Sequence, residues 1–198
     1  ANRGLSDFDI RHNAVFNAIW QVPGPRDESG VHWFASGWQI GGIYQVSSGM
    51  PFTPKIGGDP LGLETSYPFD FPDRIFGEGC QSAVNSGNPV KYIKTQCFSF
   101  PTPVTRMGNA GRNSLIGPGL SNFDFSLFKN NYIRRISENF NIQFRAEFFN
   151  ALNHPNFLPP VDNNTLFGAN GAAVTTAGLI TGTSTSSRQL QFGLKIAW

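Results

Sequence analysis

The sequence has few charged residues, little cysteine and no long apolar run. Charged side chains make up 14% of the 198 residues, whereas soluble domains average about 25%. No stretch approaches the roughly 18 consecutive apolar residues of a membrane-spanning helix, which counts against a helical membrane protein. The net charge is only +2, and no basic cluster exceeds Arg134-Arg135, so nothing points to nucleic acid as a partner.

The two cysteines, Cys80 and Cys97, fall in one loop-like stretch. An isolated pair there is a possible disulfide in an oxidising compartment such as the periplasm or the cell surface. Two unpaired thiols are the alternative. No set of His, Cys, Asp or Glu has metal-ligand spacing, and no nucleophile has a nearby base in the sequence. We therefore expect no catalytic residue, no cofactor and no metal, and a chain that is not an enzyme.

What the sequence does contain is Phe, Gly and strict alternation. There are 19 Phe and 22 Gly, and the last eleven residues, 188–198, alternate apolar and polar side chains without a break. Their apolar face consists of Leu190, Phe192, Leu194, Ile196 and Trp198. Successive side chains of a strand point to opposite faces. The segment is longer than a typical soluble strand of about 5–6 residues and fits the roughly 9–11 that cross a bilayer.

Alternation recurs in four other segments, so we expect five long strands. Their ranges are 7–22, 37–48, 121–132, 140–150 and 188–198. The apolar faces read as free of Asp, Glu, Lys and Arg. The opposite faces carry Asp7, Asp9, Arg11, Asp124, Arg145, Glu147 and Lys195. A charge facing lipid costs about 2–4 kcal/mol at the bilayer centre. This segregation predicts an all-β fold, an antiparallel transmembrane β-barrel segment with a lipid-facing and a lumen-facing side.

Connection lengths predict the orientation in the membrane. Outer-membrane barrels place short turns in the periplasm and long loops outside. The long, irregular connections 49–119 and 151–187 are therefore expected to be extracellular, with the C-terminus periplasmic. Aromatic residues favour the membrane interface, and a girdle is expected at the periplasmic strand ends. Its members are Trp20, Trp38, Tyr132 and Trp198.

The lumen-facing charges carry the most plausible function. Asp124, Arg145, Glu147 and Lys195 would be solvated in the lumen. We expect Arg145 and Glu147 to line the solute path. A salt-bridge ladder across neighbouring strands is an open alternative.

Seven segments together resemble the Oar-like TonB-dependent receptors, and they follow the order of that family. They are residues 6–12 (SDFDIRH), 37–40 (GWQI), 48–53 (SGMPFT), 108–113 (GNAGRN), 117–119 (GPG), 124–130 (DFSLFKN) and 144–157 (FRAEFFNALNHPNF). The resemblance implies a 22-stranded outer-membrane barrel with a plug, energised through TonB, that takes up or binds bulky solutes at the cell surface. With such a plug, the lumen-facing charges would pair with it, and Arg145 and Glu147 would help to hold it. We expect this chain to be the C-terminal, five-strand part of such a protein, open as a fragment.

The resemblance also implies the partners. These are outer-membrane lipid, the protein's own plug domain, the TonB complex, an unknown extracellular solute, and the barrel assembly machinery, which would read the aromatic-ended last strand. Two alternatives stay open at this point. One is a secreted β-sandwich adhesion or carbohydrate-binding module, with the aromatic stripe buried under a second sheet. The other is a small complete porin-like barrel.

Overall fold

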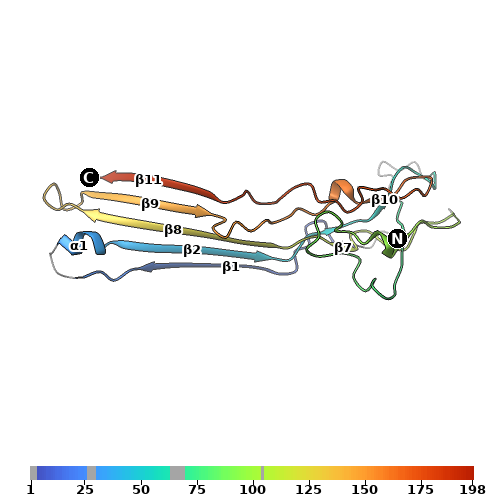
Figure 1. Cartoon of the computed structure of the whole chain (residues 1–198), viewed down its shortest axis with the longest axis horizontal. Coiled ribbons are helices and arrows are strands. Elements are labelled where there is room, and N and C mark those ends of the chain that lie inside the picture. The colour runs from blue at the N-terminus through green and yellow to red at the C-terminus, as the bar shows by residue number, and fades with distance from the viewer. Residues whose placement is uncertain (1–3, 26–29, 63–69, 104) are drawn as a thin grey trace. The chain divides into compact units, whose positions relative to one another are not determined.

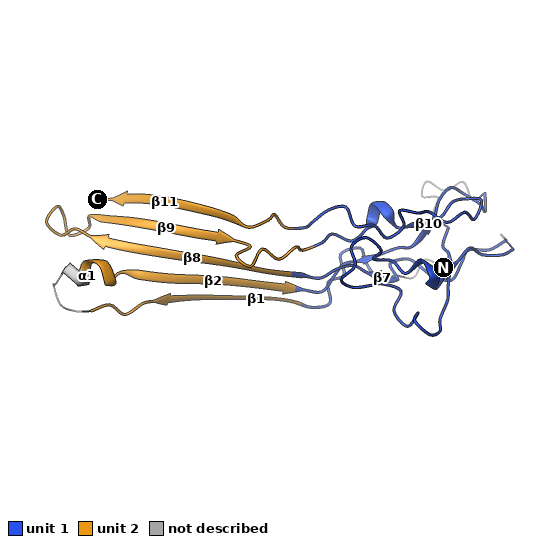
Figure 2. Ribbon diagram, in the orientation of Figure 1, with its two compact units in different colours: residues 1–12, 47–120, 157–184 blue, residues 13–46, 121–156, 185–198 orange. Residues whose placement is uncertain are grey.

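The computed structural model describes residues 4–25, 30–62, 70–103 and 105–198, with only the backbone described over 30–32. The chain forms two compact units (Figure 2). Unit 1 contains residues 1–12, 47–120 and 157–184, and unit 2 contains residues 13–46, 121–156 and 185–198.

Unit 2 is built on one sheet of five long strands. The strands are β1 (Asn13–Gln21), β2 (Trp38–Ser47), β8 (Leu120–Tyr132), β9 (Asn141–Phe149) and β11 (Gln189–Ala197). Their order in the sheet, β1-β2-β8-β9-β11, is their order in the chain, and their directions alternate (Figure 1). The expected all-β, antiparallel class is confirmed. The sheet is not closed into a barrel over the part of the chain that the structure describes.

The register of β9 and β11 joins their apolar faces. All nine residues of β11 pair with β9, from Gln189 opposite Phe149 to Ala197 opposite Asn141. Opposite residues of an antiparallel pair share one face of the sheet. The apolar side of β11 therefore continues directly into Ile142, Phe144, Ala146 and Phe148 of β9.

The first strand begins later than the alternation predicts. β1 starts at Asn13, so the expected strand over residues 7–12 is wrong. The Asp7 carboxylate instead accepts hydrogen bonds from Asn113 Nδ2 at 2.6 Å and from Arg112 at 3.2 Å. Asn113 Nδ2 also donates to the Leu5 carbonyl at 2.8 Å. These contacts hold residues 5–7 in unit 1, and Asp7 and Asp9 lie outside the long-stranded sheet.

A short helix, α1 (Gly30–Ala35), lies between β1 and β2 in the sequence. Over the described residues, no helix combines the length and the apolar character needed to cross a membrane.

Unit 1 folds around a core of its own. Its described residues form short strands and 3-10 turns: β3 (Pro51–Phe52), β4 (Lys55–Ile56), β5 (Asp73–Arg74), β6 (Phe98–Ser99), β7 (Leu115–Ile116), β10 (Thr165–Phe167), η1 (Thr95–Cys97) and η2 (Val161–Asn163). Strand pairs β3–β7 and β5–β6 are antiparallel, and β4–β10 is parallel. The buried cluster includes Phe52, Tyr92, Ile93, Phe98 and Leu166. The two long connections are thus present between the strands where they were expected, and both contribute to one packed unit, which the sequence did not predict.

Candidate membrane surface, lumen face and loop unit

The apolar face of the five-stranded sheet is open. The exposed fractions of Phe192 and Leu194 are 64% and 67%, and that of Trp198 is 88%. Phe144 of β9 and Phe192 of β11 stack with ring centroids 6.2 Å apart, and Phe125 of β8 contacts Phe148 of β9 at 5.7 Å. A β-sandwich module would bury this stripe under a second sheet. The exposure of β11 overturns that alternative.

One charged residue lies on the apolar face, contrary to the sequence-based expectation. Lys129 of β8 is directly opposite Phe144 of β9 and is therefore on the apolar side. Its side chain is nevertheless buried, with 7% exposed. Nζ donates to the carbonyl oxygens of Trp33 at 2.8 Å and Ser36 at 2.6 Å, and to Asn131 Oδ1 at 2.7 Å. Three acceptors match the three donors of the ammonium group, which compensates for its removal from water.

The four girdle residues come to the same end of the sheet. Trp20 is near the end of β1, Trp38 begins β2, Tyr132 ends β8 and Trp198 follows β11. Because neighbouring strands run in opposite directions, these positions lie at the same end of the sheet. Tyr132, however, is paired with Asn141 and lies on the polar side. The aromatic residues on the apolar side at this end are therefore the three tryptophans.

Arg145 on the polar face is held by amides and an aromatic ring. Its Nε donates to Gln143 Oε1 at 2.6 Å, and its guanidinium lies 5.5 Å from the centre of the Phe128 ring. Gln143 Nε2 in turn donates to Asn130 Oδ1 at 2.8 Å. The partner of Arg145 on β11 is Gly193, which leaves space beside the guanidinium. We call Asn130, Gln143, Arg145 and Phe128 the lumen cluster.

The salt-bridge ladder is not found. Glu147 is opposite Gln191, and Lys195 is opposite Gln143, so each charge of β9 and β11 faces a neutral side chain or none. The ion pairs among the described residues are Asp9–Arg11, Asp73–Arg106 and Asp7–Arg112, none of them between long strands. Of the lumen-facing residues predicted from the sequence, Arg145 alone joins the cluster. Asp124 instead accepts hydrogen bonds from Asn122 and from the Asn150 backbone.

Asparagines in the segment after β9 organise the ends of three strands, a role that sequence reasoning missed. Asn150 adopts a positive φ of 48°, which Asn tolerates better than most residues. Its Nδ2 donates to the carbonyls of His154 and Ser186, both at 3.0 Å. Asn156, 1% exposed, accepts from the Ser121 backbone at 2.7 Å and donates to Thr185. The spacing of Asn at positions 150, 153 and 156 was the available signal.

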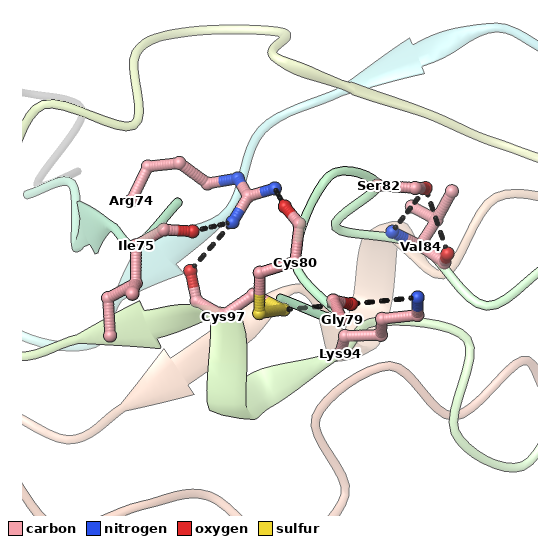
Figure 3. The surroundings of a disulfide bond; sticks show 8 residues. All are labelled: Arg74, Ile75, Gly79, Cys80, Ser82, Val84, Lys94 and Cys97. Atoms are coloured by element: carbon pink, nitrogen blue, oxygen red, sulfur yellow. Dashed lines mark hydrogen bonds between the residues drawn. A yellow bond between two sulfur atoms is a disulfide. The ribbon is translucent and has the colours of Figure 1, made fainter. Parts of the chain in front are cut away.

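The expected disulfide is present in unit 1: Cys80 and Cys97 are bonded, with Cα atoms 5.4 Å apart. The guanidinium of Arg74 points to the carbonyl oxygens on either side of it (Figure 3). It donates to Cys97 O at 3.1 Å and also to the carbonyls of Cys80 and Ile75. The Phe98 ring lies 5.4 Å from the guanidinium carbon. Burial of the Arg74 side chain lowers its pKa from the ordinary value. The disulfide and Arg74 thus close the segment between β5 and β6.

The two long connections are joined by a parallel strand pair. β4 of the first connection pairs with β10 of the second, and Ile56 and Leu166 are 2% and 1% exposed. The Lys55 backbone donates to Asn164 O at 2.9 Å, and the Gly57 backbone donates to Phe167 O at 2.8 Å. Segments far apart in the chain therefore form one body.

Several titratable groups of unit 1 are paired within the unit or buried in it. The Arg106 guanidinium makes two 2.9 Å hydrogen bonds to the Asp73 carboxylate and lowers its pKa below the ordinary value. Burial raises the pKa of Asp70, which is 4% exposed. Burial also raises the pKa of Tyr92 to about 12. In the described part of the chain, no group of three or more His, Cys, Asp or Glu is placed to hold a metal ion.

Comparison with known proteins gives one finding. Residues 1–191 match the family model described as outer membrane beta barrel domain. No curated protein matches the chain, and no solved structure matches it.

Proposed function

This chain belongs to the outer membrane beta barrel domain family and is part of a barrel protein of the bacterial outer membrane, and from this premise we propose that it is the C-terminal wall segment of a TonB-dependent receptor. In this proposal the protein takes up or binds bulky solutes at the cell surface and performs no catalysis. Its apolar face meets outer-membrane lipid, its C-terminus is periplasmic, and unit 1 is formed by extracellular loops.

The observation that carries the proposal is the packing of both long connections into one unit. Separate mobile loops would have to be ordered when a solute binds, and that ordering costs affinity. Here the β4–β10 pair, the buried cluster and the Cys80–Cys97 disulfide order the connections in advance. A loop unit that is ordered in advance suits the recognition of a bulky ligand, whereas a passive pore does not need one.

The lumen cluster supports the plug part of the proposal. Arg145 is oriented by Gln143 and Phe128, and no carboxylate of β8, β9 or β11 among the described residues neutralises it. A guanidinium presents several fixed donors and suits a carboxylate or carbonyl acceptor on a facing surface. We assign the plug domain as that surface. The barrel assembly machinery would recognise β11 and Trp198.

The test uses the full-length protein, because TonB dependence is a property of the whole receptor. Purified protein in detergent is titrated with the periplasmic domain of TonB, and the same preparation is inserted into planar bilayers. A receptor binds the TonB domain and conducts little current, because its plug occupies the lumen. A protein that does not bind the TonB domain and conducts current as an open pore would refute the proposal and favour the porin-like barrel.

A further inference from the structure

The carbonyl groups at the end of α1 are bound by side chains from the apolar face of the sheet. The last carbonyls of a helix have no partner within the helix. Lys129 Nζ donates to the carbonyl of Trp33 and to that of Ser36, the residue after the helix, and Trp38 Nε1 donates to the Phe34 carbonyl at 2.9 Å. Three donor contacts therefore tie α1 to the side of the sheet that carries Phe144.

The rings around Lys129 strengthen this attachment. Nζ lies 5.9 Å from the centre of the Trp33 ring and 5.7 Å from that of Trp38. A cation within about 6 Å of an aromatic face is attracted to it, more strongly when water is excluded. Lys129 thus contacts both the helix and the strand that follows it, and we call this arrangement the Lys129 clamp.

The outer surface of α1 is aromatic and open. Trp33 is 58% exposed and Phe34 is 69% exposed. Both belong to the connection between β1 and β2, which joins the strands at the end of the sheet where Trp20 and Trp198 also lie. Because Lys129 Nζ lies 5.9 Å and 5.7 Å from the centres of the Trp33 and Trp38 rings, the Trp33 side of this patch lies beside the apolar face of the sheet. Trp favours the boundary between headgroups and acyl chains, and short amphipathic helices can lie in that boundary.

We propose that α1 is an interfacial helix that lies among phospholipid headgroups at one rim of the barrel wall, with Trp33 and Phe34 in contact with lipid, and that the Lys129 clamp holds it there. The inference rests on the proposed function in so far as the apolar face of the sheet meets lipid. It adds a second lipid-contacting element, made by a connection rather than by a strand, and it gives a reason for a lysine on the apolar side.

The test is spin labelling of the full-length protein in vesicles of phosphatidylethanolamine and phosphatidylglycerol. A nitroxide is attached at Phe34→Cys, with Leu194→Cys as the lipid-exposed reference and Ile136→Cys as the water-exposed reference, since Ile136 is 64% exposed in the connection between β8 and β9. Collision with oxygen reports lipid, and collision with a water-soluble nickel chelate reports solvent. The expected oxygen-to-nickel ratio at position 34 is several-fold above that at 136 and approaches that at 194.

The clamp is tested in the same labelled protein. Lys129→Met nearly keeps the length of the side chain but removes its three hydrogen-bond donors. The oxygen-to-nickel ratio at position 34 should therefore fall toward the value at position 136. Lys129→Arg keeps charge and donors and should preserve the ratio. An unchanged ratio in Lys129→Met overturns the clamp.

The remaining outcomes separate the inference from the proposed function. A nickel-accessible label at position 34, with a lipid-exposed label at 194, overturns the interfacial helix and leaves the barrel wall standing. Low collision rates with both reagents at position 34 mean protein contact and also overturn the helix proposal. A nickel-accessible label at 194 refutes the lipid-facing sheet itself.

Discussion

Arginine placed on either face of β11 should reveal which face meets hydrocarbon. Leu194 points to the apolar side and is 67% exposed, so Leu194→Arg removes little packing within the chain. Gln191 is on the same strand but on the polar side, opposite Glu147. The two substitutions introduce the same side chain three residues apart, and they differ mainly in the medium that the guanidinium enters.

The expected difference is large. Arginine on the lipid face of a barrel strand costs about 2–4 kcal/mol at the bilayer centre, and every 1.4 kcal/mol is about tenfold in an equilibrium constant. Leu194→Arg should therefore lower the folding equilibrium constant by roughly 30-fold to nearly 1,000-fold. Gln191→Arg should change stability by less than about 0.5 kcal/mol, as surface substitutions usually do, and the facing carboxylate of Glu147 offsets part of any cost.

The assay is equilibrium urea unfolding of the full-length protein in phospholipid vesicles, followed by tryptophan fluorescence and by the shift of the folded band on unheated gels. The same pair measured in a short-chain detergent serves as the reference, because a detergent adapts to a charged side chain. If both variants unfold within about 0.5 kcal/mol of the parent in vesicles, the stripe of β11 does not contact hydrocarbon.

Three further predictions concern unit 1. Replacing Cys80 and Cys97 with Ala opens a link across 17 residues and should destabilise the unit by about 3 kcal/mol on the chain-entropy estimate, seen as faster proteolysis between β5 and β6. Arg106 lowers the pKa of Asp73, so the stability from this pair is complete above the ordinary Asp pKa of about 3.9 and is lost as the pH falls through the lower folded value. Protease resistance should therefore fall below about pH 4 in the parent, and Asp73→Asn should remove that step. In Gly49→Ala, the added Cβ would overlap a neighbouring backbone carbonyl oxygen, and unfolding should become easier by at least about 2 kcal/mol.

Each of these has a matched control. Reduction of the parent by dithiothreitol should reproduce the cysteine variant; equal proteolysis of oxidised and reduced protein would contradict the first prediction. Glu78→Gln, at an exposed position, should leave the acid step in place, and a step that survives Asp73→Asn would sink the second. Gly193→Ala meets only the Arg145 Cβ at 3.9 Å and should be nearly neutral. A Gly49→Ala variant as stable as Gly193→Ala would disprove the third.

The long strands could be predicted from the sequence because the alternation of apolar and polar side chains runs along their whole length. Strict alternation from Arg188 onward fixed both the strand and its apolar face, and β11 indeed pairs residue by residue with β9. The same rule failed at residues 7–12. There the Asp7 carboxylate accepts hydrogen bonds from Arg112 and Asn113, which lie about a hundred residues away and leave no trace in a local pattern.

Lys129 and the core of unit 1 could not be read from the sequence for a related reason. Alternation places Lys129 on the apolar side, but only the fold brings the carbonyls of Trp33 and Ser36 close enough to bind its ammonium group. In unit 1 the buried apolar residues follow no period. They come together through the disulfide and through contacts between two connections that are separate in the chain.

The parallel pairing of β4 with β10 has an evolutionary consequence. Surface loops of membrane barrels usually diverge one at a time, since a longer loop disturbs only itself. Here a residue inserted near Ile56 would shift its pairing with Phe167. The two connections are therefore expected to change length and composition in concert, and grafting one of them alone onto a related barrel should yield a misfolded surface.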